Sequence, residues 1–242
     1  MDSISRHVLF AMMLALAVSV ACPAPGWAAN ASYERMAPLS QYLMADRQAE
    51  IDLARSAAPP AISNHATFLV LGPHGYETTE KGTNGFTCLV ERSWMSPFDS
   101  PQFWNWNMRG PICYNPAATR TVLLYTLQRT QMALSGLSKS QMLDRSKAAV
   151  ADNRLPAPEP GSMSYMMSKH GDLGDGVGAW LSHLMFYAPK ADSAKGGASW
   201  GANLPASPVV LNTSRRVVPE PETIFMVPVA RWSDGTIAPP PM

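Results

Sequence analysis

Residues 115–153 read NPAATRTVLLYTLQRTQMALSGLSKSQMLDRSKAAVADN, and their pattern predicts two consecutive helices. Asn115 and Pro116 supply an N-cap and a first-turn proline for the first helix, because the N–H that proline lacks has no helical partner at that position. Gly136 follows Ser135 as a stop, since glycine readily adopts the left-handed backbone that ends a helix. We therefore expect one helix from Pro116 to about Ser135.

Ser138 begins the second predicted helix, which ends near Asn153. Gln141 stands three residues after Ser138, so the two side chains complete a capping box. Leu137 and Met142 occupy the positions at which a hydrophobic staple closes. These are the strongest local signals in the chain.

Short runs typical of strands lie on both sides of this helical block. Residues 86–91 alternate, with Phe86, Cys88 and Val90 on one side, as in a strand. The predicted strands are residues 67–71, 86–91, 163–167, 180–187, 209–211 and 223–232, and a further helix is predicted over 38–57. The sequence thus predicts an α+β fold, a mainly antiparallel sheet of about five to six strands packed with three helices.

The amino terminus has the pattern of a secretion signal. An apolar run over residues 8–21 follows Arg6, and Gly26-Trp27-Ala28 places small residues before a cleavage point. We expect residues 1–28 to be removed after Ala28 or Ala29, leaving 29–242 as a single α+β domain with a proline-rich C-terminal tail. Lipidation of Cys22 and retention of the segment as an anchor are alternatives. Cleavage predicts a bacterial-type protein of the periplasm or the exterior with no transmembrane anchor.

Composition narrows the class of protein further. Only 15% of the residues are charged, 22 of 242 are proline, and the formal net charge is +1. No basic run exists to neutralise phosphates, which argues against binding to nucleic acid. Cleavage would leave Cys88 and Cys113, and an even pair in an oxidising compartment predicts a disulfide.

The pattern Gly197-Ala198-Ser199-Trp200-Gly201 matches the G-x-S-x-G motif of serine hydrolases. That motif needs a strand before it, a helix after it and a histidine later in the chain. Small residues precede it here, Asn203-Leu204-Pro205 follows, and the last histidine is His183. We therefore reject the hydrolase interpretation.

A glycine-rich loop, residues 170–176 with the sequence HGDLGDG, is the first candidate ligand site. It is longer than most hairpin loops, and its imidazole and carboxylate groups suit ligand contacts or a metal such as zinc. The spacing matches no metal motif, so we predict no metal. The alternative is that the acids are turn residues and His183 is a core histidine. The candidate ligand residues here are His170, Asp172, Asp175 and His183.

Methionines near this loop suggest a second interpretation. Thioether and imidazole ligands select Cu(I). Residues three apart on a strand point to opposite faces, however, so packing in the core is favoured over copper binding. The residues concerned are Met163, Met166, Met167, His170 and Met185.

An aromatic segment, residues 93–116, is the other candidate surface. It is broken by prolines, and its aromatic residues up to Trp106 lie between Cys88 and Cys113. Either it covers the sheet, or some of its rings form a platform for a sugar or peptide, because exposing all of them to water would be costly. The ligand candidates in it are Trp94, Trp104 and Trp106.

His74 and the pair Glu91-Arg92 complete the candidates. Each is suited to acid–base chemistry, and each is equally typical of a turn or a solvated strand end. No cofactor motif is present, so no cofactor is expected, and no set of residues identifies a catalytic centre. The sequence favours an exported protein that binds a small molecule, a glycan or an envelope component. The alternative is a hydrolytic or metal-assisted enzyme that uses His74, His170, Asp172 and His183.

Overall fold

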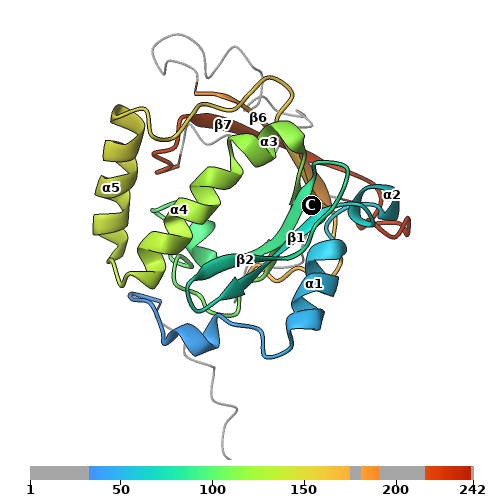
Figure 1. Ribbon diagram of the computed structural model, residues 1–242, viewed down its shortest axis with the longest axis horizontal. Helices are drawn as coiled ribbons and strands as arrows, with labels where there is room; N and C mark the ends of the chain where they lie inside the picture. Colours follow the sequence, from blue (N-terminus) through green and yellow to red (C-terminus); the bar gives the residue numbers. More distant parts are fainter. Residues whose placement is uncertain (1–32, 175–180, 191–215, 241–242) are drawn as a thin grey trace, which may run out of the picture. The chain divides into compact units, whose positions relative to one another are not determined.

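Seven strands form one sheet, in the order β2, β1, β3, β4, β5, β6, β7 (Figure 1). The computed structural model describes residues 33–174, 181–190 and 216–240. Only β1 and β3 are parallel neighbours, and the other pairs are antiparallel. The predicted α+β class is confirmed, although the strand count is seven rather than five to six. The strands are β1 (Thr67–Gly72), β2 (Gly75–Glu80), β3 (Thr87–Glu91), β4 (Gly110–Tyr114), β5 (Met163–Met166), β6 (His183–Pro189) and β7 (Glu222–Pro228).

The sequence pattern missed two strands, β2 and β4. β2 ends in Glu-Thr-Thr-Glu and lies at the edge of the sheet, where its polar side chains meet water. β4 contains Gly110 and Pro111, which read as breakers. Its pairing with β5 covers only Cys113 and Tyr114, so the N–H that Pro111 lacks is not needed in that ladder.

Several predictions from the sequence fall on residues that the structure does not describe. They are the cleavable signal, Cys22, Asp175, the strand over 209–211 and the rejected hydrolase motif at 197–201.

The central strands β1, β3 and β4 are buried on both faces of the sheet. Helix α1 (Arg47–Arg55) covers one face, where Phe68, Val70 and Val90 pack with its Ile51. Helices α3 (Pro116–Arg120) and α4 (Leu123–Leu134) cover the other face (Figure 1). Alternate residues of β1, β3 and β4 therefore face different helices, as the pleat of a strand requires.

The predicted disulfide is present between β3 and β4. Cys88 and Cys113 lie directly opposite each other in the ladder, with their Cα atoms 4.0 Å apart. Both are fully buried on the α1 side of the sheet. The bridge joins the strands from which the aromatic segment leaves and to which it returns. The segment begins with the 3₁₀ turn η2 (Ser93–Met95).

The helix caps predicted for residues 115–153 are confirmed. Ser138 and Gln141 form the capping box at the start of α5 (Lys139–Ala151). At the end of α4, Gly136 has φ +74°, and Leu137 N–H donates to the Met132 carbonyl at 3.2 Å. This hydrogen bond across a left-handed residue is the Schellman arrangement, for which glycine is suited because it has no Cβ.

The structure has more helices than the three that were expected. The long helix from Pro116 breaks at Thr121, because its hydroxyl donates to the Ala117 carbonyl at 2.8 Å and competes with the helical pattern. The helix expected over 38–57 begins only at α1, where Asp46 caps the Gln48 N–H at 2.8 Å. Two short elements complete the described helices, η1 (Leu39–Gln41) and α2 (Pro60–Ser63).

Candidate functional site

The structure separates the histidines that were proposed as catalytic. His74 is exposed in the turn between β1 and β2, where its carbonyl accepts from Gln131 Nε2 at 2.9 Å. His183 begins β6, and four strands lie between β2 and β6 in the sheet. The structure therefore does not bring these two imidazoles together.

The ligand candidates of the glycine-rich loop and its neighbour His183 are likewise divided between surface and core. His170 and Asp172 are exposed, and Asp172 Oδ1 accepts from the Gly174 N–H at 2.7 Å, as in a turn. His183 is only 4% exposed, and its Nδ1 lies 2.5 Å from the Leu181 carbonyl oxygen. Burial lowers the pKa of His183. These features match the alternative in which His183 is a core histidine.

The tryptophans of the aromatic segment lie mostly inside the protein. Trp94 and Trp104 are buried in a cluster with Tyr42 and Leu71, and Trp94 Nε1 donates to Thr130 Oγ1 at 3.1 Å. Trp106 is half-buried and meets Tyr33 edge to face, with ring centroids 5.0 Å apart. The first two rings thus cover the sheet and α4, and they present no open face to a ligand.

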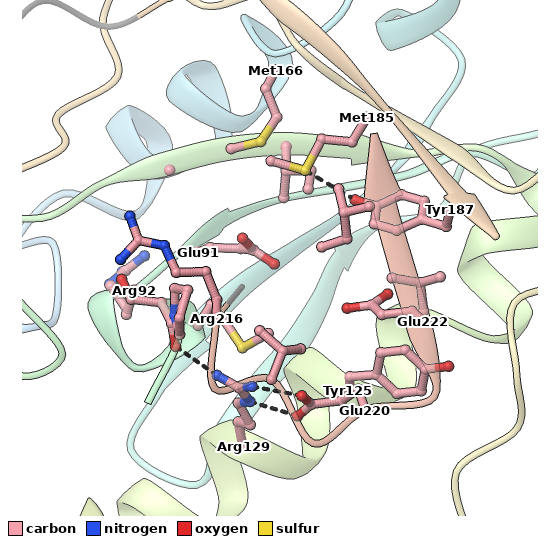
Figure 2. A pocket seen from close by; sticks show the side chains of 18 of the residues that line it. Glu91, Arg92, Tyr125, Arg129, Met166, Met185, Tyr187, Arg216, Glu220 and Glu222 are labelled. Carbon is pink, nitrogen blue, oxygen red and sulfur yellow. Dashed lines mark hydrogen bonds and ion pairs between the residues drawn. The ribbon is translucent and has the colours of Figure 1, made fainter. Parts of the chain in front are cut away.

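A cavity of about 260 Å³ lies between α4 and the strands β3 to β7 (Figure 2). None of the histidines and tryptophans proposed from the sequence lines it. Most of its wall is apolar, and this part includes Met95, Met108, Ile112, Val122, Met166, Leu173, Met185, Val218 and Ile224.

A buried ion pair closes one side of the cavity. Arg129 of α4 donates from Nε and Nη2 to the two carboxylate oxygens of Glu220, at 2.7 and 2.6 Å. Its Nη1 donates to the carbonyls of Trp94 and Ser96 at 3.1 and 2.8 Å. Four of the five N–H donors of the guanidinium are therefore engaged, and the ion pair ties α4 to the segment before β7.

Glu91, the last residue of β3, directs its carboxyl group into the cavity (Figure 2). Its Oε1 accepts hydrogen bonds from Tyr114 Oη at 2.5 Å and from Thr126 Oγ1 at 2.9 Å. Burial raises the pKa of Glu91, and these two hydroxyl donors oppose the rise. The strand end expected to be solvated is thus part of the cavity wall.

Glu222, the first residue of β7, is the second acid in the wall. It is 6% exposed, and Figure 2 shows its carboxyl group directed into the same space as that of Glu91. Burial raises its pKa to about 8, and the nearby Glu220 carboxylate contributes to the rise. At neutral pH, Glu222 is therefore mainly a neutral acid that can donate a hydrogen bond.

Glu222 makes the stability of the protein depend on pH. Between the ordinary glutamate pKa of 4.5 and about 8, the folded protein keeps a proton that the unfolded chain has released. Raising the pH through this interval thus lowers the free energy of unfolding, by at most about 1.4 kcal/mol per pH unit. We expect Glu222→Gln, which stays neutral, to lose less stability than the unchanged protein between about pH 5 and pH 8.

Urea unfolding at several pH values measures this difference. Glu77→Gln is the control, because Glu77 is exposed on the edge strand β2 and should leave the pH slope unchanged. Parallel stability curves for Glu222→Gln and the unchanged protein would show that Glu222 ionises normally.

Sequence reasoning identified only one of these polar residues. It named Glu91 but missed Arg129, Glu220 and Glu222. The available signal was the alternation of β3, which puts Glu91 on the same side as Leu89 and so on a buried face. Nothing in the local sequence connects residue 91 with residues 220 and 222.

No protein-family model, curated protein or solved structure matches the chain. Within the described ranges, no helix has the length and apolar character needed to cross a membrane. The same residues contain no group of three His, Cys, Asp or Glu side chains arranged to hold a metal ion. The cavity is therefore interpreted from its own chemistry.

Proposed function

We propose that this is an exported protein that binds a small molecule, and that the cavity between α4 and β3 to β7 is its ligand site. The observation that carries the proposal is an apolar cavity with ionisable carboxyl groups in its wall. Ligand sites typically combine an apolar lining with a few polar groups that orient the ligand. A strongly perturbed pKa in a cleft also marks a residue as a candidate for a functional site.

Energetics support the proposal. Burying a carboxyl group is costly unless its polar atoms are satisfied, and an apolar side chain would fill the same space at lower cost. Glu91 and Glu222 both have raised pKa values because of burial. A binding role explains why acids occupy positions that packing alone would give to apolar residues.

The location rests on separate observations. The signal pattern of residues 1–28 predicts export to the periplasm or the exterior, and the Cys88–Cys113 disulfide is compatible with an oxidising compartment. We do not extend the proposal to a reaction, because His74 lies in the turn between β1 and β2, whereas His183 begins β6, which four strands separate from β2.

A neutral fluorescent probe, N-phenyl-1-naphthylamine, tests the cavity. We expect its emission to rise on binding to the unchanged protein, since the cavity replaces water with apolar groups. Ile224→Trp fills the cavity and should weaken binding about tenfold or more, a loss of about 1.4 kcal/mol. Ile237→Trp makes the same change at a side chain that is 79% exposed and outside the cavity, and it should bind as the unchanged protein does.

Circular dichroism and melting temperature verify that both variants are folded. The proposal is wrong if the unchanged protein does not bind the probe. It is also wrong if the two tryptophan variants bind the probe equally well, because the probe then occupies another surface.

A further inference from the structure

The carboxyl group of Glu91 has an oxygen that the fold does not use. Both of its hydrogen bonds, from Tyr114 and Thr126, go to Oε1. Among the described residues, none donates a hydrogen bond to Oε2. The two hydroxyl groups fix the orientation of the carboxyl group, so that it is held toward the cavity before any ligand arrives (Figure 2).

The arginines of the cavity wall are committed to other carboxylates. Arg129 binds both oxygens of Glu220. Arg92 donates from Nη2 to Glu50 of α1 at 2.9 Å, and from Nε to the Tyr42 carbonyl at 2.7 Å.

The third arginine of the wall, Arg216, is paired with Asp99 at 3.6 Å. In the part of the chain that the structure describes, no cation therefore forms an ion pair with Glu91, although the charge of Arg129 acts on it from a distance. The wall holds a carboxyl group that is oriented and has no ion-pair partner of its own.

We infer that the ligand is a small organic ammonium ion, an inference that rests on the proposed function. The N–H group of this ion donates a hydrogen bond to Oε2 of Glu91, and its apolar body lies among the methionines of the cavity. A charged N–H···O⁻ hydrogen bond is about twice as strong as a neutral one. It is stronger still where water is excluded, so it can offset the cost of removing both charges from water.

The apolar part of the wall fits the body of such a ligand. Met95, Met108, Met166 and Met185 contribute flexible, polarisable side chains that adapt to an irregular alkyl or aryl group. At about 260 Å³ the cavity lies below the usual range for drug-sized ligands, which indicates a compact molecule.

The same wall disfavours an anion. A ligand carboxylate would lie beside the Glu91 carboxylate, and like charges in a poorly solvated site repel each other. Arg129 already pairs with both oxygens of Glu220, so a bidentate pair with a ligand carboxylate would require it to give up Glu220. Charge complementarity therefore separates cationic from neutral and anionic ligands of equal size.

Competition against N-phenyl-1-naphthylamine tests the inference with three probes of similar size: benzylamine, benzyl alcohol and benzoate. At about pH 7.5 the amine is a cation, and we expect it to displace the fluorescent probe at a concentration about tenfold lower than the alcohol. Benzoate should be the weakest of the three. This comparison uses the unchanged protein and needs no variant.

Glu91→Gln then tests the contact itself. Glutamine keeps an oxygen to accept from Tyr114 and Thr126 but cannot carry the negative charge, so the preference for amine over alcohol should fall about tenfold. Glu77→Gln, on the exposed edge strand, should leave that preference unchanged.

The possible outcomes separate this inference from the proposed function. The inference is overturned if the alcohol or benzoate competes as well as the amine, if no competitor displaces the bound probe, or if Glu91→Gln keeps the full preference. The cavity would remain a binding site in each of these cases. Absence of fluorescent-probe binding before any competitor is added would instead refute the proposed function, and the inference would fall with it.

Discussion

Replacing Arg129 with methionine should lower the free energy of unfolding by about 3–5 kcal/mol. The change leaves the Glu220 carboxylate buried with no guanidinium to neutralise it, and it removes donors from the Trp94 and Ser96 carbonyls. Since a domain is typically stable by about 5–15 kcal/mol, such a loss is a large fraction of the total. Urea unfolding followed by tryptophan fluorescence measures it.

An exposed ion pair of the same kind provides the control. Arg120 binds both oxygens of Glu159, at 3.1 and 2.6 Å, but the two side chains are 59% and 39% exposed. We expect Arg120→Met to cost far less stability than Arg129→Met, because exposed pairs gain little over solvation by water.

The double variant Arg129→Met/Glu220→Leu should recover much of the loss, since two apolar side chains can replace a buried pair. Equal, small effects of Arg129→Met and Arg120→Met would contradict the importance given to burial.

Removing the Cys88–Cys113 bridge should lower the free energy of unfolding by about 3.5 kcal/mol in the chain-entropy model. The bridge closes a loop over a sequence separation of 25 residues, and it restricts the unfolded chain more than the folded one. The double variant Cys88→Ala/Cys113→Ala measures the loss by urea unfolding.

Unfolding the unchanged protein in a reductant separates the cross-link from the packing of the sulfur atoms, because both thiols then remain in the core. Peptide mapping after thiol labelling checks the bridge directly. Both cysteines should be protected in denatured, unreduced protein and labelled after reduction. Full labelling before reduction would show that the bridge does not form.

Local signals predicted those parts of the fold that depend on near neighbours in the sequence. The capping box at Ser138, the N-cap at Asn115 and the stop at Gly136 each involve residues within one or two turns of a helix. The alternation of β3 likewise placed Cys88 and Val90 on one face.

Local sequence patterns gave wrong predictions where the position of a residue in the sheet outweighs its usual structural preference. Pro111 and Gly110 read as breakers, yet β4 accommodates them because its ladder with β5 begins further along. β2 is too polar for a buried strand, but the edge of the sheet accepts it. The helix breaks at Thr121, where the hydroxyl donates to a backbone carbonyl. The spacing of the apolar residues does not predict this hydrogen bond.

For this protein, then, the sequence by itself determined the α+β class, the pair of cysteines and the helix caps at Asn115, Ser138 and Gly136. The caps could be predicted because they depend on short-range geometry. Only the tertiary structure placed Glu91 in the wall of the cavity. Glu91 and Arg92 are adjacent in the chain and both line the cavity, but their partners differ. Glu91 accepts hydrogen bonds from Tyr114 and Thr126, whereas Arg92 donates to Glu50 of α1. Residues far apart, such as Glu91 and Glu222, meet across the sheet, and only the packing of β3 against α4 and the arrangement of β7 bring their carboxyl groups into one apolar cavity.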